Sequence, residues 1–225
     1  MALPWDLDDS RRNHKRAART DLVVRSIQCP HMRFTLFYDG ELPPNGNAAA
    51  KHKIREALHP QIKELWQHQG LVNIDYVLAS LEDHPGPNDR RAESWGKHVG
   101  SVNGVRFASV VHPTFYLRAR LKILLLRASP PGGVLTDGGD IDNRLKTLFD
   151  ALSRPSSQQL PPGWAPAPDQ IPLHCLLDDD RLVTAVAVDS DRLLGPALPN
   201  WARVTIQVHL HAAQSAHAHA LFLTP

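Results

Sequence analysis

Two short acidic segments combine residue types that could hold a metal ion. The first, Asp140-Ile141-Asp142-Asn143, directly follows the pair Gly138-Gly139, and Lys146 comes four residues after Asp142. A spacing of four residues places Lys146 and Asp142 on the same face of a helix. The second segment, Asp178-Asp179-Asp180, ends a short apolar run. We expect these two segments, which are far apart in the sequence, to converge in space.

These residue types suit the hydrolysis of a phosphodiester. The reaction needs the charge of the phosphate neutralised and a water molecule made nucleophilic, and a hard cation held by a few carboxylates does both. Mg²⁺ prefers sparse sites of oxygen ligands in which it keeps several waters. A lysine beside such a site can stabilise charge on the scissile phosphate or on the leaving oxygen.

Each acidic segment also has a purely structural interpretation. Asp140 is a suitable N-cap for the helix that follows, and Asp142 and Asn143 complement the dipole of that helix. The three consecutive aspartates, Asp178-Asp179-Asp180, are also typical of a solvated turn. Taken one at a time, the two segments therefore leave both interpretations open.

The elements predicted around these segments are two helices and several short strands. Residues 140–152 carry apolar side chains at helical spacing, as do residues 49–69, where Pro60 predicts a kink or break near His59. Residues 153–172 contain six prolines and are expected to form a loop. Residues 70–113 have weak signals apart from a hairpin turn at Asn103-Gly104. Strands are predicted at about 33–38, 116–127, 174–177, 182–188 and 203–210.

The strand predicted at 116–127 has one apolar and one basic face. Its side chains alternate, so Arg118, Arg120 and Lys122 point away from the apolar positions between them. The strand leads through a glycine-rich link to Asp140, so its basic face could lie beside the metal site and follow a DNA backbone. A merely solvated face is the alternative. We expect Arg118, Arg120 and Lys122, together with Arg144, to contact DNA.

Composition limits the classes of protein that fit. The chain has 225 residues, of which 42% are hydrophobic, and a net charge of +2, so a DNA-binding surface must come from local clusters of cations. Two cysteines, Cys29 and Cys175, are too few for a disulfide framework. The sequence shows neither a signal peptide nor an apolar stretch long enough to span a bilayer. We therefore expect a cytoplasmic protein with no membrane segment.

The longer sequence around the first acidic segment resembles a known family. Gly139 to Leu152, GDIDNRLKTLFDAL, resembles the signature D-x-D-N-x-x-K-x-x-x-D-A-L of the RusA-type Holliday junction resolvases. Leu177 to Leu182, LDDDRL, resembles the L-D-D-x-Q-[IV] segment of that family, and Leu42-Pro43-Pro44-Asn45 resembles its L-P-P-S-x-N start. The resemblance covers roughly half of the chain, and the first motif is the most specific.

The resemblance implies a role for each matched residue. Asp140 and Asp142 would be the first metal-binding pair, and Lys146 the essential lysine. Asp179 would be the downstream catalytic aspartate and third metal ligand, or Asp180 if the match shifts by one residue. The implied cofactor is Mg²⁺, with Mn²⁺ as a substitute.

The resemblance also implies a fold and a substrate. The fold would be α+β, a small mixed β-sheet with packed helices, enlarged here by insertions. A homodimer would bind branched DNA such as a four-way junction and nick two strands symmetrically, leaving 5′-phosphate and 3′-hydroxyl ends.

The chain departs from this family in length and at one motif position. We expect a basic N-terminal extension at 1–30, a nuclease domain at 31–211 with insertions at about 70–113 and 153–172, and a C-terminal tail at 212–225. Arg181 stands where the family usually has glutamine. These departures leave a second hypothesis open, a DNA-binding or partner-binding protein that keeps the fold and does not cut.

Overall fold

The computed structural model describes residues 32–66, 99–113, 117–128, 140–196 and 198–212, with Asp140 and Ala212 described by their backbone alone. These residues form two α-helices and two β-sheets, which confirms the expected α+β class. The predicted N-terminal extension (1–30), the glycine-rich link after the basic strand and the tail beyond Ala212 lie outside the described residues. The helices are α2 (Ala48–Leu65) and α5 (Asp140–Leu152), and the strands are β1 (Arg33–Glu41), β2 (Val99–Val102), β3 (Val105–Val111), β4 (Leu117–Arg127), β5 (Leu173–Leu177), β6 (Val183–Arg192) and β7 (Trp201–Ala212).

The larger sheet is mixed and has the strand order β1-β7-β4-β6. Strand β7 pairs antiparallel with β1 and with β4, whereas β4 and β6 run parallel. β4 has the predicted alternation, because every second residue from Leu117 to Arg127 is buried and Arg120 and Lys122 are exposed on the other face. The two faces of this sheet therefore differ in character, one apolar and one carrying cations.

The smaller sheet, β2-β3-β5, contains two strands that the sequence did not predict, β2 and β3. The turn at Asn103-Gly104 has positive φ angles of 50° and 81° and joins β2 to β3, which confirms the predicted hairpin. β3 then pairs parallel with β5 and is buried from Phe107 to Val111. The weak sequence signals at residues 99–111 indicated this hairpin turn and did not reveal the strands on either side of it. The continuous apolar run of β3 is typical of a strand buried on both faces.

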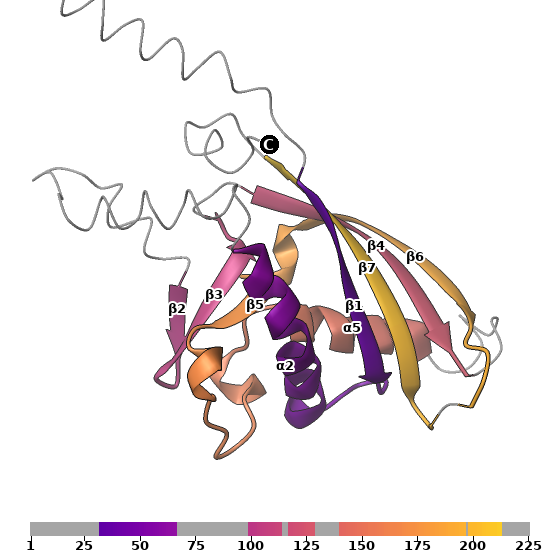
Figure 1. Cartoon of the computed structure of the whole chain (residues 1–225), viewed down its shortest axis with the longest axis horizontal. Helices are drawn as coiled ribbons and strands as arrows, with labels where there is room; N and C mark the ends of the chain where they lie inside the picture. Colours follow the sequence, from indigo (N-terminus) through magenta and orange to yellow (C-terminus); the bar gives the residue numbers. More distant parts are fainter. Residues whose placement is uncertain (1–31, 67–98, 114–116, 129–139, 197, 213–225) are drawn as a thin grey trace, which may run out of the picture.

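The two helices cover the apolar face of the larger sheet (Figure 1). Helix α2 begins at the N-cap Asn47, whose side chain accepts a hydrogen bond from the N–H of Ala50. The helix continues through Pro60 to Leu65, so the expected break is absent. Ile62 and Leu65, beyond the proline, are buried, and their burial holds the last turn in helical form.

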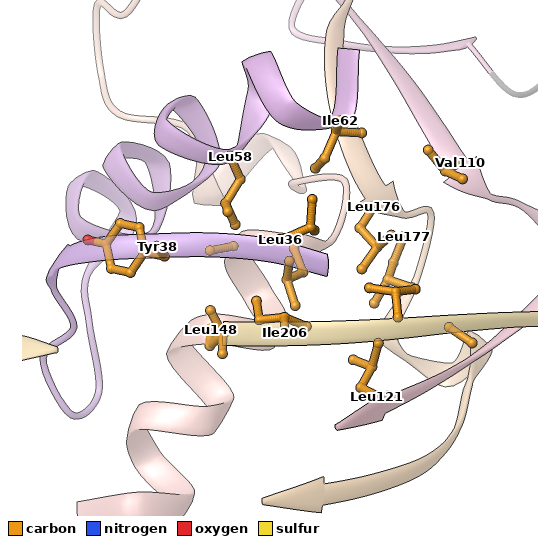
Figure 2. Close-up of a cluster of buried hydrophobic side chains, with 14 of the residues drawn as sticks. Leu36, Tyr38, Leu58, Ile62, Val110, Leu121, Leu148, Leu176, Leu177 and Ile206 are labelled. Carbon is orange, nitrogen blue, oxygen red and sulfur yellow. The ribbon is translucent and has the colours of Figure 1, made fainter. Parts of the chain in front are cut away.

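Helix α5 has the bounds that its apolar spacing predicted, and it contributes to one shared core. Figure 2 shows Leu148 of α5 converging with Leu121 of β4, Ile206 of β7 and Leu36 of β1. Residues 153–172 are mostly irregular, as expected, and contain two short 3₁₀ turns. Within the described part of the chain, no helix has the length and apolar character needed to cross a membrane.

Candidate active site

The C-terminal half of α5 is fixed by Arg55 of α2, which is buried. Arg55 Nη2 donates to the carbonyl oxygen of Asp150 over 2.8 Å, and Nε donates to that of Ser153 over 3.3 Å. The last turn of a helix leaves carbonyl groups without an internal partner, and Arg55 supplies donors for them. The Asp150 side chain forms an ion pair with Lys51 at 2.7 Å. Asp150 therefore anchors α5 to α2.

The N-terminal half of α5 is fixed by the loop that joins β1 to α2. Thr147 Oγ1 accepts a hydrogen bond of 2.8 Å from the N–H of Gly46. Arg144 is only 9% exposed, and its guanidinium donates to the carbonyl oxygen of Leu42 and to Asn200 Oδ1. The expectation that Arg144 contacts DNA is therefore corrected, because its donors hold two loops against α5.

Asp142 and Lys146 lie on the exposed face of α5, one turn apart. Ile141 and Leu148 are buried on the opposite face of the helix. Asp140 is the first residue of α5, and its side chain lies outside the described residues. Both interpretations of Asp140, N-cap and metal ligand, therefore stay open.

The second acidic segment returns to α5. Leu177 at the end of β5 forms a β-bridge with Ser153, directly after the C-terminal end of α5. Asp180–Leu182 form the 3₁₀ helix η5, which packs against α5. Leu182 enters the same buried cluster as Leu148. The chain after β5 therefore contacts the helix that carries the first acidic segment.

Asp178 has a structural role in this return path. Its carboxylate forms an ion pair with Arg154 at 2.8 Å and lies 3.7 Å from Nε2 of His112. Only 11% of the Asp178 side chain is exposed. These contacts join the ends of β3, β5 and α5, so Asp178 fixes the point from which the two following aspartates emerge.

Asp179 is held by the neighbouring Arg181. Its Oδ1 accepts from the backbone N–H and from Nε of Arg181, both at 2.9 Å, and Oδ2 accepts from Nη2 at 2.8 Å. The hydrogen bonds from Arg181 lower the pKa of Asp179 to about 2, so the carboxylate is ionised at neutral pH. Asp180, the alternative ligand, is exposed at the start of η5.

The predicted metal site is only partly within the described residues. Among the side chains that the structure describes, no group of three or more His, Cys, Asp or Glu lies close enough to hold a metal ion. Asp142 and Asp179 belong to that set, whereas Asp140 does not. Carboxylate oxygens are the ligands that Mg²⁺ prefers, so the donor chemistry fits. The three-carboxylate site remains a prediction.

The basic face of β4 lies on the far side of the sheet from α5. The apolar side chains of β4 face the helices, so Arg120 and Lys122 project from the opposite face and Arg118 is half-buried there. The expectation that this face lies beside the metal site is corrected. The register adds residues that the sequence did not indicate, because Arg33 of β1 and Arg120 of β4 both lie opposite His209 of β7.

Comparisons with protein-family models, with curated proteins and with solved structures gave no match for this chain. The resemblance to the RusA-type resolvases therefore rests on the sequence motifs.

Proposed function

We infer that the protein is a Mg²⁺-dependent endonuclease that cuts branched DNA such as a four-way junction. The observation that carries this proposal is the path of the second acidic segment. It packs against α5, the helix on which Asp142 and Lys146 are exposed. The two acidic segments are separated in the sequence by a proline-containing loop. The first begins α5 and the second contacts it, which supports a site with ligands from both segments.

The ligands would be Asp140, Asp142 and Asp179, with Asp180 as the alternative to Asp179. When bound, Mg²⁺ or Mn²⁺ supplies neutralisation of phosphate charge and a water of lowered pKa. Within the described residues, Oδ2 of Asp179 accepts only the hydrogen bond from Nη2 of Arg181, so it keeps a lone pair with which the carboxylate could bind an ion. Arg181 is 87% exposed, so it can move without disturbing the core.

Lys146 would act on the phosphate itself. It is exposed one turn from Asp142, and its ammonium is a donor that can meet a phosphate oxygen or the leaving oxygen. Three other residues would position these groups, because their hydrogen bonds fix both halves of α5: Arg55, Arg144 and Thr147. A rigid helix keeps the acidic and basic groups at a constant separation, as catalysis by orientation requires.

A cleavage assay on a synthetic four-way junction tests the proposal. We expect paired nicks with Mg²⁺, none with EDTA, and none from Asp142→Asn. The matched control is Asp191→Asn, which makes the same change at an exposed aspartate of β6 and should cleave like the wild type. Tight junction binding without nicks from the wild type in Mg²⁺ would instead support the second hypothesis, a non-cleaving DNA-binding protein.

A further inference from the structure

A hollow of about 550 Å³ lies on the outer face of the larger sheet, away from α2 and α5. Its polar lining comes from three strands, with the cations Arg33 on β1 and Arg120 and Lys122 on β4, and the imidazole of His209 on β7. The register sets Arg33 and Arg120 on either side of His209, so these side chains form one row across the strands.

The charge of this row is largely uncompensated. Nζ of Lys122 lies 3.8 Å from Oδ2 of Asp189. Both side chains are more than 60% exposed, so this ion pair is weak. Within the part of the chain that the structure describes, neither Arg33 nor Arg120 has an acidic partner. Adjacent cations without partners favour an anionic ligand.

The floor of the hollow is apolar. It is made of Ala185 and Ala187 of β6, whose small side chains leave room above the sheet. Gln207 lies between Thr35 and Lys122 in the register and adds an amide beside the apolar floor. A phosphate alone would need only the cations, whereas a nucleotide would also cover the apolar floor with the face of its base.

We propose that this hollow binds a nucleotide of a single-stranded segment of nucleic acid. The phosphates meet Arg33, Arg120 and Lys122, and the base lies on the alanine floor with its edge toward Gln207. This inference extends the proposed function, because the hollow and α5 are on opposite faces of the sheet. The bound strand is then an unpaired part of the branched substrate and is separate from the strand that is cut.

A second copy of the chain fits the same surface less well. A two-fold interface would bring Arg33 and Arg120 close to their own copies, and like charges repel. Asp39 of β1 already bonds Arg203, so it offers little to the cations of a second copy. Charge complementarity therefore favours a polyanion.

Fluorescence anisotropy with a labelled oligothymidylate of about 12 nucleotides tests the charge of the hollow in EDTA, where no cleavage occurs. Arg33→Gln/Arg120→Gln in the full chain should weaken binding at least about tenfold and reduce the slope of log affinity against log salt by about 1.4, or about 0.7 for each lost phosphate contact. The matched control Arg106→Gln/Arg192→Gln removes two exposed cations elsewhere and should leave affinity and slope unchanged.

A second variant tests the floor without changing charge. Ala187→Leu fills the hollow and should weaken binding about fivefold or more, about 1 kcal/mol, with an unchanged salt slope, because the larger side chain occupies the place of the base. Equal affinity of this variant and the wild type, or no binding by the folded wild type, would overturn the inference. A change in oligomeric mass in either variant without a change in oligothymidylate affinity would also overturn it, because the surface would then bind a second copy.

Failure of this inference is distinguishable from failure of the proposed function. The wild type and Ala187→Leu, which removes no charge, are also assayed for cleavage of a fully paired four-way junction in Mg²⁺, and we expect both to cleave it. A wild type that cleaves junctions and ignores the oligothymidylate refutes the inference alone. A wild type that binds the oligothymidylate and never cleaves refutes the nuclease proposal alone.

Discussion

Lys146 is exposed one turn from Asp142, and it offers a way to separate chemistry from binding. We expect Lys146→Ala to lower the cleavage rate about 10²–10³-fold, the scale at which loss of one transition-state donor acts. Junction affinity should change far less. Rapid-quench cleavage and equilibrium binding in Ca²⁺ measure the two effects, with Lys53→Ala, an exposed lysine of α2, as the control. Equal losses in rate and affinity would make Lys146 a ground-state phosphate contact.

Arg144 is buried at the edge of the hydrophobic core, and its replacement should lower the stability of the fold. Arg144→Met removes the donors to the Leu42 carbonyl and to Asn200 and leaves a buried carbonyl without its partner. We expect the free energy of unfolding in urea to fall by about 1–3 kcal/mol. DNA affinity of the folded variant should be unchanged. If Arg144→Met instead had wild-type stability and bound DNA more weakly, Arg144 would contact DNA after all.

The role of Arg144 could not be read from the sequence. An arginine next to an acidic segment is usually exposed, and burial becomes favourable only when polar acceptors satisfy the guanidinium. Its acceptors come from residues 102 and 56 positions away in the chain. Such distant partners leave no local pattern. The shared helical face of Asp142 and Lys146 follows from their spacing alone, and both side chains are exposed on α5.

At the level of elements, the contact between α2 and the loop at 153–172 should weaken in acid. His52 is buried, with its ring centroid 4.1 Å from that of Trp164, and Glu56 accepts a hydrogen bond from Trp164. Burial, together with the neighbouring Arg55, lowers the pKa of His52 to about 4. The unfolded chain therefore binds more protons than the folded chain between pH 6.5 and 4.

The sign of this shift predicts that stability falls as pH drops from about 6.5 to about 4, by at most about 3 kcal/mol for this residue. Thermal unfolding at pH 7 and pH 4.5 measures the loss. His52→Gln should lower the melting temperature at pH 7 and show a smaller further decrease at pH 4.5. An acid-induced decrease as large as that of the wild type would contradict the assignment to His52.

Elements defined by local patterns were predicted, and those defined by distant pairing were not. The bounds of α5 and the alternation of β4 follow from apolar spacing over a dozen residues. The parallel pairing of β3 with β5 joins residues more than 60 positions apart, which no local spacing encodes. The position of the basic face could have been derived, because a helix with an apolar stripe packs on the apolar face of the strand before it.

At the level of the whole molecule, we expect a homodimer. A four-way junction has approximate two-fold symmetry, and two copies of one site related by a two-fold axis would cut two strands symmetrically. Light scattering on the full chain should give twice the mass of one chain, and nicks should appear at symmetry-related positions. A monomer at the concentrations that support cleavage would refute the symmetric arrangement and leave the chemistry of one site unaffected.

The most direct test of the central claim is the location of a bound ion. A crystal structure with Mn²⁺, identified by its anomalous scattering, should show one ion shared by carboxylate oxygens of Asp140, Asp142 and Asp179. An ion bound by Asp180 in place of Asp179 would support the alternative in which the motif match shifts by one residue. An ion held elsewhere, or Asp142 and Asp179 too far apart to share it, would contradict the proposal that the two acidic segments form one site.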